Sequence, residues 1–184
     1  MTAPVLSELT GTYTLDPTHT RFGFVARHAM VTKVRGSFTE FEGTGVVNGD
    51  DLAASTANVT LQVASVNTSN EQRDAHLRTN DFFDAPKYPT ITFASTGVER
   101  VDETSFNLNG NLTIKDVTKP VTVKMEYTGF ATDPYGNQRL GLEGTARINR
   151  RDFGVDFHAA LETGGVLVSD KIDLEFDISA IKTA

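Results

Sequence analysis

The feature that most constrains this chain is an alternation of apolar and polar residues that runs through most of its length. Residues 121–127 place Val, Val, Met and Tyr at every second position, and residues 172–178 repeat the pattern with Ile, Leu, Phe and Ile. Such alternation is typical of antiparallel strands with one buried face and one solvated face. Several of these segments approach ten residues, which is longer than the usual strand of about five or six. We therefore predict an all-β fold of about eight long strands, closed into a single antiparallel barrel because closure removes exposed edges.

Turn residues separate the predicted strands. Residues 48–50 (NGD), 133–137 (DPYGN) and 164–165 (GG) have the composition of tight turns. The dipeptide Asn109-Gly110 lies inside an alternating segment, so we expect a bend or bulge within one long strand there.

One segment departs from the alternation. Residues 68–78 (TSNEQRDAHLR) are polar and contain neither glycine nor proline, and Ser69 and Asn70 are candidate caps in front of Glu71. This composition predicts a short helix near residues 69–78. An aromatic pair, Phe82-Phe83, follows between turn residues and is expected to cover one mouth of the barrel.

Size and charge bound the class of protein. The chain has 184 residues, which suits one domain over residues 1–184. Its net charge of −7 makes a nucleic-acid partner unlikely on electrostatic grounds and argues against a basic patch that docks on anionic lipids, and no run of Lys and Arg exceeds Arg150-Arg151. There is no cysteine and no apolar stretch long enough to span a membrane. Because the first residues lack the pattern of a secretory signal, we expect a cytoplasmic protein.

No catalytic or metal-binding pattern is visible. The four histidines, His19, His28, His76 and His158, are not spaced as ligands on one helix face, and neither a G-x-S-x-G nucleophile motif nor a glycine-rich phosphate loop occurs. We expect His19, after Asp16-Pro17, to take part in a hydrogen-bonded turn. The sequence thus predicts no metal, no catalytic residue and no enzyme.

Aromatic content is the informative feature of the interior. Phe accounts for 12 residues and Trp for none, and many Phe fall at the apolar positions of predicted strands. A small eight-stranded barrel can be filled by its own side chains or can hold one ligand. Periodicity indicates an apolar interior in both cases, so the residues leave a filled core and a hollow one open.

Four further motifs occur in order along the chain. They occupy residues 13–38 (beginning YTLDPTHTRFGF), residues 65–93 (with SVNT, RDAHL, DFFD, KYP and ITF), residues 110–121 (GNLTIKDVTKPV) and residues 149–155 (NRRDFGV) followed by residues 168–170. Together they resemble the YceI-like, polyisoprenoid-binding family. Two positions depart from the family pattern: Thr20 replaces a more usual Ser, and Lys115-Asp116 stands where a basic residue is more often followed by Gly. Asp116 is expected to change the geometry of a hairpin turn.

The resemblance implies an extended, lipocalin-like barrel whose tunnel carries or sequesters a long-chain amphiphile, either a polyisoprenoid or an isoprenoid quinone, with no other cofactor. Alternation assigns the tunnel lining, and the aromatic pair is expected to form its gate; the predicted ligand-binding residues are Phe22, Phe24, Phe38, Val59, Leu61, Phe82, Phe83, Ile91, Phe93, Leu112, Ile114, Met125 and Leu142. Arg73, Asp74 and His76 are expected at the tunnel mouth, where they either meet a head group or fasten the helix to the barrel.

Two other functions stay open at this point: an enzyme that acts on a lipid or quinone at the mouth, and a structural or stress-associated module with a filled core. The barrel surface is compatible with a monomer or a homodimer.

Overall fold

The computed structural model describes residues 3–157 and 168–184, and strands dominate it. His158 and the turn predicted at residues 164–165 lie outside the described residues. The elements in chain order are α1 (Leu6–Leu9), β1 (Gly11–Leu15), β2 (Arg21–His28), β3 (Thr32–Phe38), β4 (Phe41–Val47), η1 (Leu52–Ala54), β5 (Thr56–Gln62), η2 (Val63–Ser65), β6 (Val66–Asn67), α2 (Glu71–Leu77), β7 (Thr90–Arg100), β8 (Ser105–Ile114), β9 (Val117–Thr132), β10 (Gln138–Asn149), η3 (Arg150–Phe153) and β11 (Lys171–Lys182).

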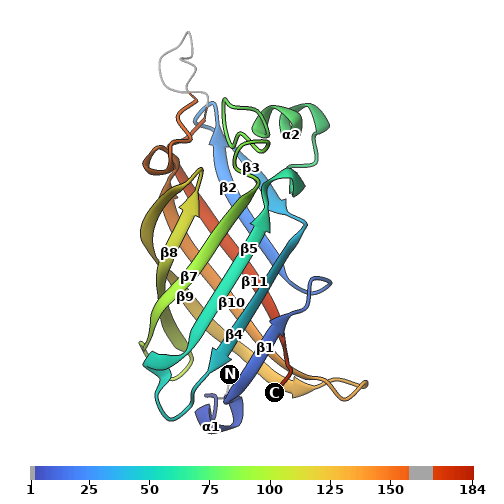
Figure 1. The fold of residues 1–184 in the computed structure, drawn as a ribbon, viewed down its shortest axis with the longest axis vertical. Coiled ribbons are helices and arrows are strands. Elements are labelled where there is room, and N and C mark those ends of the chain that lie inside the picture. The colour runs from blue at the N-terminus through green and yellow to red at the C-terminus, as the bar shows by residue number, and fades with distance from the viewer. Residues whose placement is uncertain (1–2, 158–167) are drawn as a thin grey trace.

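The strands form one antiparallel sheet that closes on itself (Figure 1). Three positions in the wall are each occupied by two short strands, one after the other. In the first position, β1 and β2 both pair with β11. In the second, β4 pairs with β1 and β3 pairs with β2; in the third, β5 pairs with β4 and β6 pairs with β3. Counted in this way, the described residues make a barrel wall of eight positions, and the pairing of β1 with β11 completes the ring. The prediction of a closed barrel with about eight strands is confirmed.

A hydrogen-bonded turn separates β1 from β2. Asp16 accepts a hydrogen bond from the backbone N–H of Thr18 (3.0 Å) and contacts His19 Nδ1 at 2.8 Å, as the sequence predicted for this turn. Beyond it, the Thr20 hydroxyl donates to the Ser179 carbonyl and accepts from the Ser179 N–H, both at 3.1 Å. The side chain of Thr20 thus continues the ladder to β11 where the backbone of the turn does not, and this role needs only a hydroxyl, which Thr supplies as well as Ser.

The other departure from the family pattern also has a visible consequence. Lys115 and Asp116 form the two-residue turn between β8 and β9, and both have positive φ angles, 51° and 59°. Turns of this kind match the twist of the strands and usually take Asn and Gly. Asp116 therefore adopts the turn geometry at some conformational cost.

The long strands bend by bulges. β8 is continuous through Asn109-Gly110, and the irregularity lies opposite, between Ser95 and Gly97 of β7. The Phe93 ring occupies the space that a side chain at position 110 would need. The irregularity expected at Asn109-Gly110 is therefore a close contact of an aromatic ring with Gly110, together with a bulge in the partner strand β7.

The two ends of the barrel carry different elements (Figure 1). The single-turn helix α1 lies at the end where both chain termini lie, and α2 lies at the other end. The predicted short helix is confirmed as α2, with the Asn70 side chain accepting a hydrogen bond from the N–H of Arg73 (3.0 Å) as its cap. None of the helices among the described residues is sufficiently long and apolar to cross a bilayer.

Candidate functional site: an apolar tunnel and its mouth

The barrel encloses a cavity of about 370 Å³, within the usual range of ligand pockets. Its walls come from every position in the ring, from Leu9 and Leu140 at the α1 end to Ile148 and Phe82 at the α2 end. Leu140 and Ile148 both lie on β10, about 27 Å apart at about 3.4 Å per residue. A strand tilt of about 40° makes this roughly 20 Å along the barrel axis, so the cavity is a tunnel and not a local void.

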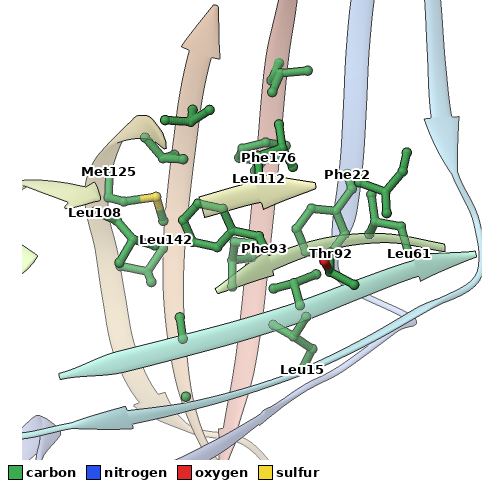
Figure 2. A pocket seen from close by; sticks show the side chains of 18 of the residues that line it. Leu15, Phe22, Leu61, Thr92, Phe93, Leu108, Leu112, Met125, Leu142 and Phe176 are labelled. Atoms are coloured by element: carbon green, nitrogen blue, oxygen red, sulfur yellow. The ribbon is translucent and has the colours of Figure 1, made fainter. Parts of the chain in front are cut away.

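The tunnel is lined by inward side chains at alternate strand positions. Figure 2 shows Phe22, Phe93, Leu112 and Phe176 converging across it from four different strands. Two edge-to-face contacts join Phe22 to Phe41 and Phe176, with ring centroids 4.9 and 5.5 Å apart. The aromatic rings therefore pack on one another along the wall and leave the axis open.

All thirteen residues predicted to bind a ligand, eleven from alternation and two as the gate, line this cavity: Phe22, Phe24, Phe38, Val59, Leu61, Phe82, Phe83, Ile91, Phe93, Leu112, Ile114, Met125 and Leu142. Their contact with a ligand stays a prediction. The sequence-based list was incomplete: the same alternation could have added Leu108, Leu174, Phe176 and Ile178, which also line the cavity.

The lining has few polar groups. At the α1 end, the Tyr13 hydroxyl donates to the Leu9 carbonyl (2.7 Å), and burial, together with the neighbouring Tyr127, raises the pKa of Tyr13. Tyr127 also lines the cavity and is 9% exposed. Within the described part of the chain its hydroxyl makes no hydrogen bond. Tyr127 is thus a polar group that a bound molecule could satisfy.

The gate residues lie where the sequence predicted. Phe83 packs on Phe38 of the barrel wall (centroids 5.8 Å apart), whereas Phe82 packs on His76 of α2 (5.1 Å) and on Phe157 (4.9 Å). His76 in turn contacts Asp81 Oδ2 through Nε2 at 2.8 Å. The aromatic pair therefore links the wall to α2 across the tunnel mouth.

A second cavity of about 410 Å³ opens beside the gate and shares Phe24, Leu77 and Phe82 with the tunnel. Its other walls combine polar residues with apolar ones; the polar residues are Arg27, His28, Thr68, Asn70, Gln72, Arg73 and His76, and the apolar residues are Ala26, Val34, Phe157 and Val168. This vestibule holds two of the three predicted mouth residues. Sequence reasoning missed Arg27 and His28, because β2 reaches the mouth only through the closure of the barrel.

Asp74, the third predicted mouth residue, lines neither cavity. It is 7% exposed, and its Oδ1 accepts from both the N–H and the hydroxyl of Thr68, at 2.9 and 2.6 Å. Arg73 donates to the same residue, through Nε to the hydroxyl and through Nη2 to the carbonyl, at 2.7 and 2.8 Å. Asp74 thus fastens α2 to the preceding strand, and Arg73 combines that role with a place in the vestibule.

A buried arginine braces the same end. Arg150 is 4% exposed and lines the end of the tunnel. Its guanidinium donates to the carbonyls of Ser169, Val155 and Val168, at 2.9, 2.7 and 3.3 Å, and burial lowers its pKa. These bonds tie residues 155 and 168–169 to the barrel rim. The motif around Arg150 was visible in the sequence, but its carbonyl partners were not.

The described residues offer no grouping of three histidines or acids that could hold a metal ion. The site is therefore a barrel with an apolar tunnel, lined at one end by Leu6 and Leu9 of α1 and adjoined at the other by a vestibule of mixed polar and apolar residues. That arrangement defines an extended, lipocalin-like barrel built around an interior cavity.

Comparison with known proteins gives the family. The model of the YceI-like domain matches residues 13–180. UPF0312 protein SA2479 of Staphylococcus aureus is 39% identical over 171 residues, which cover 91% of this chain and 95% of that protein. The crystal structure of the Campylobacter jejuni YCEI protein superposes with a TM-score of 0.74 at 30% identity, covering 86% of this chain and 90% of that one. The chain belongs to the YceI-like family.

Two more distant structures share the fold. Burkholderia cenocepacia BcnA has a TM-score of 0.78 at 24% identity, covering 90% of this chain and 98% of its own. A domain of Saccharophagus degradans described as polyisoprenoid-binding has a TM-score of 0.71 at 16% identity, covering 93% and 98%.

Proposed function

We propose that this protein binds a long-chain amphiphilic lipid in its tunnel, with the chain along the barrel axis and the head group in the vestibule, and that it carries or sequesters this lipid. The observation that carries the proposal is a continuous apolar cavity of about 370 Å³ that adjoins, at the α2 end, a vestibule where Arg27, His28, Arg73 and His76 come together. A polyisoprenoid or an isoprenoid quinone is the ligand class. The description of the Saccharophagus degradans domain as polyisoprenoid-binding supports it at the level of the fold.

The energetics favour a chain over a compact ligand. Each buried CH₂ contributes about 0.8 kcal/mol, so ten such carbons contribute roughly 8 kcal/mol before ordering and association costs. The tunnel wall offers almost no hydrogen-bonding groups to a ligand that needs them. Affinity therefore comes from chain length, and the vestibule adds a modest preference for the head group.

A binding role, without catalysis, is part of this proposal. His76 and Asp81 form the one acid–base pair at the gate that the described residues bring together, and both side chains are about half exposed, at 45% and 49%. Catalytic groups of this kind usually lie in water-excluded sites that perturb their pKa. The location in the cytoplasm and the possible homodimer stay predictions.

Native mass spectrometry of freshly purified protein, with organic extraction of bound material, tests the proposal directly. A stoichiometric long-chain lipid is the expected result, and it would be recovered chemically unchanged after incubation with the protein. A bare mass that persists after exposure to polyprenyl compounds, quinones and fatty acids would refute the tunnel as a lipid site and leave the structural module.

A matched pair of variants locates the lipid. Leu142 lines the tunnel and Glu143, the next residue of β10, is exposed on the outer face. Leu142→Gln places a polar amide against the chain and should weaken lipid binding at least about fivefold, since an unpaired amide in an apolar environment costs about 1–3 kcal/mol. Glu143→Gln should leave it unchanged. Equal loss in both variants would contradict binding in the tunnel.

A further inference from the structure

The hairpin of β2 and β3 lies beside the tunnel mouth and is unlike the rest of the surface. Residues 21–38 contain Arg21, Arg27, Lys33 and Arg35 and neither Asp nor Glu, in a chain whose net charge is −7. At its tip, Met30 and Val31 are 59% and 75% exposed. An exposed apolar tip flanked by cations is the composition that anionic membrane surfaces attract.

The register of the hairpin brings two of the cations together. Arg27 and Lys33 are directly opposite partners in the ladder between β2 and β3, and both are exposed. Like charges at directly opposite positions destabilise a sheet. On the neighbouring strand β11, Asp173 pairs with Arg147 at 2.6 Å and also interacts with the charges of Lys33 and Arg27, and Glu175 pairs with Arg35 at 3.3 Å. Asp173 thus faces three cations, which leaves Arg27 and Lys33 with an excess of positive charge that an external anion would stabilise.

The backbone of the tip is held in a costly conformation. Ala29 and Met30 have φ angles of 51° and 66°, and the Val31 N–H donates to the His28 carbonyl at 3.1 Å to close the turn. Three residues, Ala29 to Val31, join the paired His28 and Thr32, and residues other than Gly and Asn pay a steric penalty at positive φ. Here the turn instead presents apolar side chains to solvent, which neither folding nor solubility requires.

The position of the hairpin connects it to the tunnel. Arg27 and His28 line the vestibule together with Phe82 and Arg73, and Figure 1 shows the turn between β2 and β3 at the α2 end of the barrel. A membrane that contacts the tip thus faces the gate. We propose that this hairpin docks the barrel, mouth first, on an anionic lipid bilayer, with Met30 and Val31 entering the interface and Arg27 and Lys33 at the lipid phosphates. The role of this docking in loading or delivering a lipid rests on the proposed function, whereas the docking itself does not.

Vesicle flotation with the full chain tests the docking, using bilayers free of isoprenoids so that failure of the carrier function has no effect on the result. Binding is expected to vesicles of equal parts phosphatidylcholine and phosphatidylglycerol, but not to phosphatidylcholine alone. It should be lost between about 0.1 M and 1 M salt, as the Debye length falls from about 10 to 3 Å. Absence of binding to the anionic vesicles at low salt would overturn the proposal and leave an acidic protein as the partner for the hairpin.

Two double variants separate the contributions of charge and apolar surface. Arg27→Gln with Lys33→Gln should weaken vesicle binding about fivefold for each cation removed, and should not destabilise the fold because it relieves repulsion. Met30→Gly with Val31→Ser removes the apolar tip, and glycine suits the positive φ at position 30. Val101→Ser is the matched control, since Val101 is also 59% exposed but lies in the turn after β7 at the α1 end. Binding that survives both double variants, or that Val101→Ser weakens equally, would contradict the assignment.

Orientation can be measured separately because the chain contains no cysteine. A single Val31→Cys or Val101→Cys variant then carries an environment-sensitive fluorophore at one defined end. Anionic vesicles should shift the emission of the label at position 31 to the blue and leave the label at position 101 unchanged. A shift at both positions, or at position 101 alone, would overturn mouth-first docking.

Discussion

The two ends of the barrel solve the same problem, covering an apolar interior, in different ways. The α1 end is closed by one helical turn whose Leu9 plugs the tunnel and is tethered by the Tyr13 hydroxyl. The α2 end is covered by a long excursion between β5 and β7, which the buried Asp74 braces through Thr68, while the buried Arg150 separately ties residues 155 and 168–169 to the rim. The cover at the α1 end consists largely of apolar contacts. The cover at the α2 end surrounds the tunnel mouth.

Under the proposed function, this difference indicates which end would select the head group of the ligand. Polar groups cost free energy when they are buried, so an end that only had to exclude water would not need them. Here Asp74 holds α2 in place next to a vestibule that includes the cations Arg27 and Arg73. The four predictions below break or sharpen this comparison, from the largest expected effect on stability to the smallest.

The Arg150→Met variant should lower the free energy of unfolding by about 4 kcal/mol. It leaves the carbonyls of Ser169, Val155 and Val168 without their donor, and each unmet buried group costs about 1–3 kcal/mol. Urea denaturation measures the loss. Arg151→Met is the control, because Arg151 is 39% exposed and pairs with Asp170 at the surface; a loss below about 1 kcal/mol is expected there. Equal losses would contradict the bracing role of Arg150.

Truncation of one buried apolar side chain at each end separates the effect on stability from the effect on lipid entry. Phe82 at the gate and Leu9 of α1 are both 6% exposed. Replacing either by Ala should lower the free energy of unfolding by about 3 kcal/mol. Stopped-flow uptake of a fluorescent long-chain lipid should be faster in Phe82→Ala and unchanged in Leu9→Ala, because only the first opens toward the vestibule. Faster uptake in Leu9→Ala alone would place the entrance at the α1 end.

The two tyrosines at the closed end should respond differently to loss of their hydroxyls. Tyr13→Phe removes the hydrogen bond to Leu9 and should destabilise the protein by about 1 kcal/mol. Tyr127→Phe removes a hydroxyl with no partner among the described residues, so a change within about 0.5 kcal/mol is expected in the lipid-free protein. Thermal unfolding of both variants measures the difference. A large loss in Tyr127→Phe would assign that hydroxyl a structural role in place of the ligand-facing one.

Acid should loosen the α1 end selectively, with the smallest effect because the groups lie near the surface. Arg139 bridges Asp16 and Asp133 at 2.6 and 2.7 Å and lowers the pKa of each carboxyl from 3.8 to about 2. A carboxyl with a depressed pKa stabilises the fold above its unfolded pKa, and that contribution is lost as pH falls toward the folded value. Hydrogen exchange in the turn between β9 and β10 should therefore rise between about pH 4 and pH 2. The Asp16→Asn variant should flatten this dependence, and an unaltered profile would contradict it.

Much of the fold was predictable because alternation is a local property. Each strand position is followed by one on the opposite face, so residues such as Phe93 and Leu112 could be assigned to the interior without knowledge of their partners. The cap at Asn70 is local as well, because an Asn side chain reaches the N–H three residues on. The eleven lining residues that were predicted from alternation share one cavity for this reason.

Other features depended on partners far along the chain. Arg150 reads as a surface cation in a basic pair, and its burial depends on carbonyls contributed by residues 155, 168 and 169. Asp74 reads as a mouth residue, but it turns toward Thr68. The overall acidic charge argued against a basic docking patch, whereas the β2–β3 pairing places Arg27 beside Lys33 next to the vestibule.

The sequence by itself determined the strand periodicity, the inward and outward faces, the helix cap and the family motifs, because each of these is encoded over a few neighbouring residues. Only the tertiary structure decided that the apolar faces leave a tunnel between them. It also decided which end α1 covers, which end adjoins the vestibule, and which charges meet at the mouth. The physical reason is that a cavity and a charge cluster are properties of closure. They depend on how strands distant in the chain are spaced around the ring, and alternation within one strand carries no information on that spacing.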